Sequence, residues 1–158
     1  MKSTSKTYIV SIAIALAVGG LSALLTMGNM DIYSKIIRPP FSPPSILFPI
    51  VWTLLYILMG ISSAMIYQKQ KSNPKAVNHA LIIYALNLFL NFFWSIIFFN
   101  FEAYLFAFLL LLLLWLVIII MIVKFYRIEP LAAYLQIPYL IWVTFAGYLN
   151  LAIYILNR

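Results

Sequence analysis

The stretch from Tyr104 to Val123, YLFAFLLLLLLWLVIIIMIV, decides the fold class of this chain. It contains no charged residue, no histidine, and neither glycine nor proline. An α-helix needs roughly 20 predominantly apolar residues to cross about 30 Å of hydrocarbon. Because a segment this apolar on every side has no polar face to present to water, the stretch predicts a transmembrane helix.

Four further stretches have the same character, and none contains Asp, Glu, Lys, Arg or His. They are residues 8–27, 46–67, 80–99 and 131–156. The first follows Lys2 and Lys6 as in a signal peptide, but it is longer than the usual ~7–15 apolar residues, so we interpret it as a retained span. The sequence therefore predicts an all-α integral membrane bundle of five transmembrane helices, with a single domain over residues 1–158.

The overall composition agrees with a membrane protein. Of the residues, 66% are hydrophobic and 8% are charged, against about 25% charged in typical soluble domains. The formal net charge is +7, but the basic residues lie at the ends of the apolar stretches, so we expect no nucleic-acid partner. Cysteine is absent, which excludes disulfides, thiolate metal ligands and a cysteine nucleophile.

The basic residues also predict the orientation, because cytoplasmic loops carry an excess of Lys and Arg. With five spans, the N-terminus shares a side with residues 68–78 and 124–130. That side has Lys2, Lys6, Lys69, Lys71, Lys75, Lys124 and Arg127, and the other has Lys35, Arg38 and Arg158. We therefore expect a cytoplasmic N-terminus, with the long loop 28–45 and the C-terminus outside.

No ionisable side chain lies inside any of the five stretches. Such residues mark proton relays and ion paths in membrane proteins, so a proton-coupled exporter or a charge-lined channel is not expected. The chain also has no phosphate-binding loop, no cluster of metal-ligating residues and no nucleophile beside a base. We accordingly expect no metal and no required cofactor.

Three of the stretches carry aromatic, amide and small residues on one face, at helical spacing. These residues are Pro49, Trp52, Tyr56, Gly60 and Ser63; Tyr84, Asn87, Asn91, Trp94 and Phe98; and Tyr139, Trp142, Ala146 and Asn150. If the three faces point inward together, they line an apolar pocket with a few hydrogen-bonding groups. Ordinary helix packing explains such stripes equally simply and is the more common cause.

The remaining two stretches lack such a face. Ala15, Gly19 and Ala23 form a ridge of small residues, which lets helix backbones approach closely within the fold or in a dimer. Residues 104–123 have no polar face, and we expect them to face lipid.

Three long segments resemble one known family. They are residues 38–60, RPPFSPPSILFPIVWTLLYILMG; residues 87–94, NLFLNFFW; and residues 138–150, PYLIWVTFAGYLN. In this order and at this spacing they are similar to the translocator protein family, TspO/MBR, also called tryptophan-rich sensory protein or peripheral-type benzodiazepine receptor. The resemblance covers nearly the whole chain and indicates a bacterial-type member, hence a multi-pass protein of the cell membrane.

The resemblance implies a membrane receptor or carrier, often a homodimer, with a sensory or stress-regulatory role. The implied ligands are porphyrins such as protoporphyrin IX or haem, benzodiazepine-type or isoquinoline drug-like compounds, and sterols in some members. Tyr33 matches a loop tyrosine that covers the ligand, Trp52 and Trp142 match paired indoles that contact it, and Asn91 and Ala146 match further lining residues. With the stripes, the candidate ligand-binding residues are Tyr33, Trp52, Tyr56, Asn87, Asn91, Trp94, Tyr139, Trp142, Ala146 and Asn150.

Two alternatives remain open at this point. One is an enzyme that degrades porphyrin in light, in which Trp52 and Trp142 would be the catalytic residues. The other is a structural membrane partner protein without a small-molecule ligand.

Overall fold

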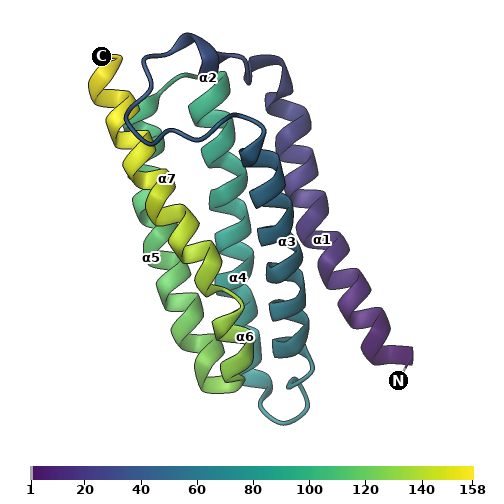
Figure 1. Ribbon diagram of the computed structural model, residues 1–158. Coiled ribbons are helices and arrows are strands. Elements are labelled where there is room, and N and C mark those ends of the chain that lie inside the picture. The colour runs from purple at the N-terminus through teal and green to yellow at the C-terminus, as the bar shows by residue number, and fades with distance from the viewer. Residues whose placement is uncertain (1) are drawn as a thin grey trace.

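The computed structural model describes residues 2–158, which form a bundle of long helices without strands (Figure 1). The long helices are α1 Lys2–Thr26, α3 Leu47–Tyr67, α4 Pro74–Ser95, α5 Tyr104–Ile128 and α7 Ile137–Leu156. Short elements are η1 Met27–Asn29, α2 Ile32–Lys35, η2 Ile96–Asn100 and α6 Pro130–Tyr134. Five helical segments of the described chain are long and apolar enough to cross a membrane, which confirms the predicted fold class.

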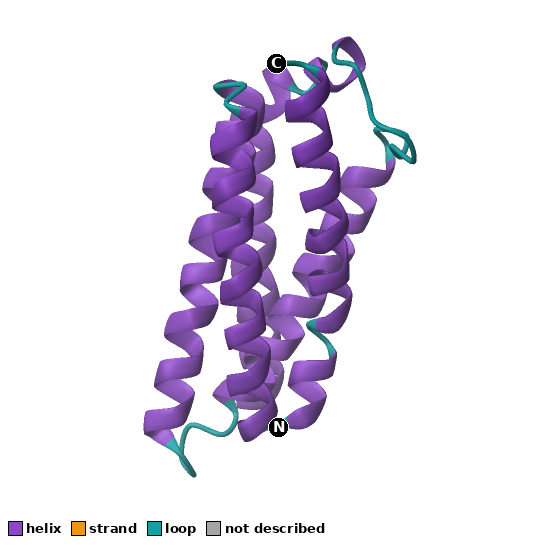
Figure 2. Ribbon diagram, turned by 90° about the vertical axis from the view of Figure 1, so that its left-hand side faces the viewer, coloured by secondary structure: helices purple, strands orange, loops and turns teal. Residues whose placement is uncertain are grey.

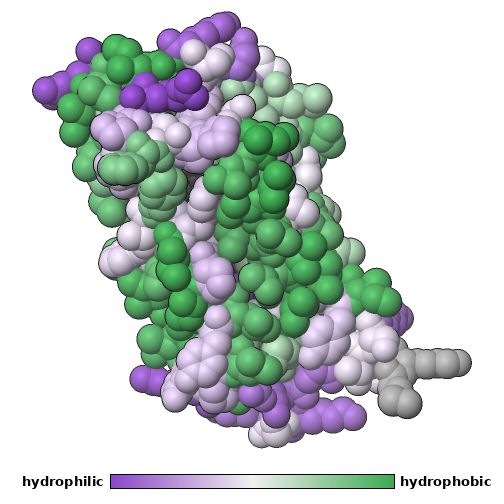
Figure 3. Space-filling model, in the orientation of Figure 1, coloured by the Kyte–Doolittle hydropathy of each residue, from purple (hydrophilic) through white to green (hydrophobic). Residues whose placement is uncertain are grey.

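The helices lie side by side, and the connections gather at the two ends of the bundle (Figure 2). The long loop and the C-terminus lie at one end, and the N-terminus and α6 lie at the other (Figure 1). The predicted grouping of the loops is therefore correct. The surface agrees with a membrane position, because hydrophobic side chains cover the middle and hydrophilic ones gather toward the two ends (Figure 3).

Prolines set the starts of three helices. Pro74, Pro130 and Pro138 each occupy one of the first two helical positions, where a missing backbone N–H leaves no bond broken. The side chain of Asn73 also accepts a hydrogen bond from the Ala76 amide at 3.4 Å, which caps α4.

The fifth predicted span, residues 131–156, is confirmed as one apolar helical segment, Pro130–Leu156, but its helix is interrupted. It consists of α6 and α7, with a break at Leu135 and Gln136. Pro138 has no N–H to donate to the carbonyl of Tyr134, four residues earlier, so the helical ladder is interrupted there.

Helix α1 packs mainly against α3, and two glycines make the contact possible. A Cβ atom at Gly19 would lie 2.4 Å from the ring of Tyr56, and one at Gly60 would lie 2.5 Å from Cα of Ile12. Only residues without a side chain allow this approach. The small residue Gly19 of the predicted ridge therefore serves packing within the chain.

The expectation that residues 104–123 only face lipid is wrong for half of the helix. Helix α5 packs against α4, α6 and α7, and its inward face is buried. The buried residues include Leu111, Leu114, Val117, Ile118 and Met121, whereas Leu109, Leu112, Leu113, Leu116 and Ile120 are exposed. Since leucine and isoleucine suit lipid and protein interior equally well, hydropathy alone did not distinguish the two faces.

Candidate ligand-binding cavity

A cavity of about 500 Å³ lies beneath the long loop, between α1, α3, α4, η2 and α7. This volume is in the range of sites that enclose drug-sized ligands. Its lining combines aromatic rings, aliphatic side chains and a few hydroxyl and amide groups. The lining residues are Gly19, Ser22, Ala23, Thr26, Met30, Asp31, Tyr33, Ser45, Ile46, Phe48, Pro49, Trp52, Tyr56, Asn91, Trp94, Ser95, Phe98, Phe99, Ala146, Leu149, Asn150 and Ile153.

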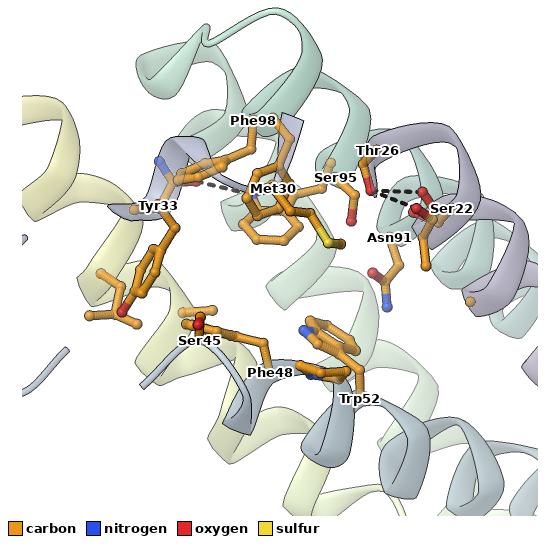
Figure 4. Close-up of a pocket in the computed structure, with 18 of the residues that line it drawn as sticks. Ser22, Thr26, Met30, Tyr33, Ser45, Phe48, Trp52, Asn91, Ser95 and Phe98 are labelled. Carbon is orange, nitrogen blue, oxygen red and sulfur yellow. Dashed lines mark hydrogen bonds between the residues drawn. The ribbon is translucent and has the colours of Figure 1, made fainter. Parts of the chain in front are cut away.

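Aromatic rings form two opposite parts of the wall. On α3, the ring centroids of Trp52 and Tyr56 lie 5.8 Å apart, because the two residues are one helical turn apart. On the other side, Trp94 of α4 lies 5.4 Å from Phe98 of η2. Figure 4 shows Trp52 and Phe98 on opposite sides of the open space. Such rings give large, flat, apolar contact surfaces.

Element η2 is a wider helical turn at the end of α4, in which backbone hydrogen bonds skip one residue more than usual. Turns of this kind often occur at functional sites, because they change the direction in which side chains point. Here η2 contributes both Phe98 and Phe99 to the cavity wall.

The long loop covers the cavity through Tyr33 of α2. The Tyr33 hydroxyl donates a hydrogen bond of 2.8 Å to the carbonyl of Pro43, and its ring meets the edge of Phe48 at 5.1 Å. The guanidinium of Arg38 lies over the same ring at 5.2 Å from its centroid. These contacts hold the tyrosine in place and bury it.

Further hydrogen bonds tie the loop to the last helix. The side chain of Asn157 donates to the carbonyl of Ile37 at 2.9 Å and accepts from its N–H at 2.8 Å, as a paired peptide group would. Tyr148 donates to the carbonyl of Pro40 at 2.8 Å. The loop is therefore attached to α7 at two points.

The deeper polar residues form two hydrogen-bonded groups. In one, Tyr139 of α7 donates to the Asn87 side chain and accepts from Asn91, at 3.0 Å. In the other, Trp94 donates to Asn150 at 2.9 Å, and Asn150 donates to the carbonyl of Tyr104 at 2.8 Å. Both groups join helices across the bundle, in a place where water cannot satisfy polar atoms.

Charge is confined to the rim of the cavity. Among the described lining residues only Asp31 is charged, and it forms an ion pair of 2.9 Å with Lys35. The hydrogen bond and the attraction between the two groups lower the pKa of Asp31 and raise the pKa of Lys35. Both side chains are exposed, so the pair contributes little to stability.

Seven of the ten residues predicted from the sequence line this cavity. They are Tyr33, Trp52, Tyr56, Asn91, Trp94, Ala146 and Asn150. The other three lie behind the wall. Asn87 and Tyr139 are buried and bonded to each other, whereas Trp142 packs against Phe48, which lines the cavity, at 5.8 Å between ring centroids. Of the two indoles expected to contact a ligand, Trp52 therefore lines the cavity and Trp142 does not.

The sequence reasoning missed the contribution of α1. Ser22, Ala23 and Thr26 line the cavity together with Gly19. Their spacing of three and four residues places them on one helical face, a signal that was present in the sequence. Small side chains on an apolar helix are equally typical of close helix packing, which is how the sequence analysis interpreted Gly19 and Ala23.

These features define a class of protein: a five-helix membrane protein with a ligand-sized apolar cavity covered by a loop. The sequence profile of the TspO/MBR family matches residues 11–156. The chain is 37% identical over 153 residues to the tryptophan-rich protein TspO of Chlorobaculum tepidum, covering 96% of both chains. It is 37% identical to protein CrtK of Rhodobacter capsulatus, covering 95% of this chain and 90% of that one. It is also 32% identical to the translocator protein of Bos taurus, covering 84% of this chain and 79% of that one. The chain belongs to the TspO/MBR family.

Proposed function

We propose that this chain is a membrane receptor or carrier that binds porphyrins and other flat hydrophobic ligands in the cavity beneath the long loop. The observation that carries the proposal is the cavity itself, about 500 Å³ in volume and walled by indole, phenol and phenyl rings. A planar tetrapyrrole presents an extended π-surface, which rings of this kind contact favourably. Drug-like ligands of the benzodiazepine or isoquinoline type would compete for the same space.

The position of charge supports a ligand with an apolar body and a polar edge. The interior of the cavity is uncharged, and the charged groups Asp31, Lys35 and Arg38 lie in the loop that forms its cover. Burying an ionised carboxylate in an apolar site is costly unless it is paired. A porphyrin would therefore place its propionates toward the loop and its apolar edge inside.

The names of the relatives support a role at the membrane but do not distinguish sensing from transport. Two of them are named tryptophan-rich sensory protein and translocator protein. We accordingly propose that ligand binding serves either sensing or passage across the membrane. The homodimer and the sterol ligands implied by the resemblance stay predictions.

Titration with protoporphyrin IX tests the proposed function. In the dark, saturable quenching of tryptophan fluorescence is expected, because Trp52 and Trp94 lie in the cavity wall. Absence of saturable quenching would contradict the proposal and favour a structural partner protein. Illumination of the complex addresses the second alternative, since loss of porphyrin absorbance that depends on the protein would indicate the degrading enzyme.

We also propose the orientation derived from the basic residues, with the N-terminus in the cytoplasm. The chain has no cysteine, so single cysteines can be labelled without background. In intact cells, Lys35→Cys should react with an impermeant maleimide, and Lys71→Cys should be protected. The opposite pattern would reverse the orientation.

A further inference from the structure

In the buried group formed by Asn87, Tyr139 and Asn91, it is fixed which atom donates and which accepts each hydrogen bond. The order is set by a backbone carbonyl. The Asn87 side chain donates from Nδ2 to the carbonyl of Tyr84 at 3.3 Å. A carbonyl oxygen can only accept, so the nitrogen of the amide must face it. The oxygen of Asn87 consequently faces the opposite way, toward Tyr139.

The orientation of Asn87 in turn fixes the hydrogen bonds of Tyr139 and Asn91. Because the Asn87 oxygen can only accept, the single proton of the Tyr139 hydroxyl is donated to it. The hydroxyl oxygen can then only accept from its other neighbour, and it does so from Nδ2 of Asn91 at 3.0 Å. Asn87, Tyr139 and Asn91 are at most 2% exposed, so water does not compete for these bonds.

Because the nitrogen of the Asn91 amide bonds to Tyr139, its oxygen faces the cavity. Asn91 lines the cavity, and Figure 4 shows its oxygen directed toward the open space. Three other donors of the wall are already engaged within the described chain. Trp94 donates to Asn150, Tyr33 donates to Pro43, and Thr26 donates to the carbonyl of Ser22 at 2.9 Å.

We propose that the Asn91 oxygen selects ligands that carry a hydrogen-bond donor, N–H or O–H, on their buried edge. A ligand with only acceptors on that edge would bring two oxygen lone pairs together, and the amide could not turn without breaking its bond to Tyr139. Tyr139 is then a positioning residue that acts through Asn91. This inference rests on the proposed function, since it specifies which ligands the same cavity prefers.

Two porphyrins form a matched pair of probes. Haematoporphyrin carries hydroxyethyl groups on the edge opposite its propionates, whereas 2,4-diacetyldeuteroporphyrin carries acetyl groups there. The propionates and the ring are the same, and only the first compound has a donor on the edge expected to enter first. The wild-type protein should bind haematoporphyrin about three- to tenfold more tightly, the scale of one buried hydrogen bond.

Tyr139→Phe should remove this preference, because the Asn91 amide is then free to turn its nitrogen toward the cavity. The ratio of the two dissociation constants should fall to about one or reverse. Asn91→Leu leaves the bond between Tyr139 and Asn87 in place and should also abolish the preference, which provides a second variant if Tyr139→Phe fails to fold. The control is Trp115→Phe, which removes a hydrogen bond of 2.9 Å to Thr144 and should keep the preference, because neither residue lines the cavity.

Equal affinity of the wild-type protein for the two porphyrins would overturn this inference and leave the proposed function intact. A preference that survives in both Tyr139→Phe and Asn91→Leu would overturn it as well. If neither porphyrin binds saturably, the proposed function fails and this inference fails with it.

Discussion

The two halves of the bundle are built from the same kind of apolar helix but pack differently. In the half that contains α6, small residues such as Gly60, Ala64, Ala80 and Ala132 are buried, and Gly60 lies directly against Ile12 of α1. In the half beneath the long loop, large rings such as Trp52, Trp94 and Phe98 occupy the corresponding places and enclose about 500 Å³. Small side chains let helices meet closely. Rings are buried in the half with α6 too, but Phe125 lies against Tyr84 and Tyr139 bonds to two asparagines, and none of these three rings lines the cavity.

The largest effect is expected in the tightly packed half. Gly60→Ala places a methyl group 2.5 Å from Cα of Ile12, where no flexible side chain can move away. Overpacking of this kind costs about 1–3 kcal/mol. The thermal unfolding midpoint in detergent should fall clearly. Gly20→Ala is the matched control, because its added Cβ meets nothing within 4 Å and the midpoint should hardly change.

An effect of the same order is expected from the polar bridge in the half with the cavity. Asn150→Leu removes the acceptor of the Trp94 indole and leaves a buried N–H without a partner. An unsatisfied buried donor costs about 1–3 kcal/mol, and the loss should appear as a lower unfolding midpoint. Asn78→Leu is the comparison, because the Asn78 side chain is exposed at the end of the bundle and accepts a hydrogen bond from Gln70. Equal midpoints for the two variants would contradict the bridging role.

Ligand binding should respond to the rings of the cavity while the bundle stays folded. Trp52→Leu should weaken protoporphyrin binding several-fold to about tenfold, since one aromatic contact contributes about 0.5–1.5 kcal/mol beyond the area it buries. Trp142→Leu should have a smaller effect, because Trp142 packs behind Phe48 and does not line the cavity. A dark fluorescence titration measures both.

The control for these two variants is Phe106→Leu, a large exposed ring on α5. Trp115 is less suitable, since its hydrogen bond to Thr144 joins α5 to α7. Equal losses at Trp52 and Phe106 would indicate general destabilisation. An unchanged affinity in Trp52→Leu would show that the face of α3 with Trp52 serves helix packing and not ligand binding.

The smallest effect is expected at the attachment of the loop. Asn157→Ala removes the two hydrogen bonds to the backbone of Ile37, which are exposed to solvent and therefore contribute little. Protoporphyrin should dissociate about two- to fivefold faster, in line with a loss below about 1 kcal/mol. Stopped-flow displacement measures the rate, and Asn78→Ala serves as an exposed asparagine that is not attached to the loop. Identical dissociation rates would show that the loop is held by its other contacts.

The sequence by itself determined the class of the protein. Five apolar stretches of sufficient length predict five helices across a membrane, because the thickness of the hydrocarbon and the cost of burying charge act on local sequence. Helical periodicity also predicted part of the cavity wall, including Trp52, Asn91 and Asn150, since residues three and four apart share a face. Pro138 was visible in the sequence too, and it accounts for the break between α6 and α7 within the fifth span.

Only the tertiary structure decided which members of each stripe reach the cavity. Trp142 has the spacing of a lining residue but lies behind Phe48, and Tyr139 lies between two asparagines. The face of α1 that lines the cavity has a helical spacing in the sequence, but that spacing does not distinguish a cavity wall from a packing face. The buried face of α5 was not visible in the sequence, because lipid and protein interior accept the same apolar residues. The direction of the Asn91 amide depends on a chain of bonds that begins at the carbonyl of Tyr84. Such a direction arises only when side chains from different helices meet, so no local pattern in the sequence encodes it.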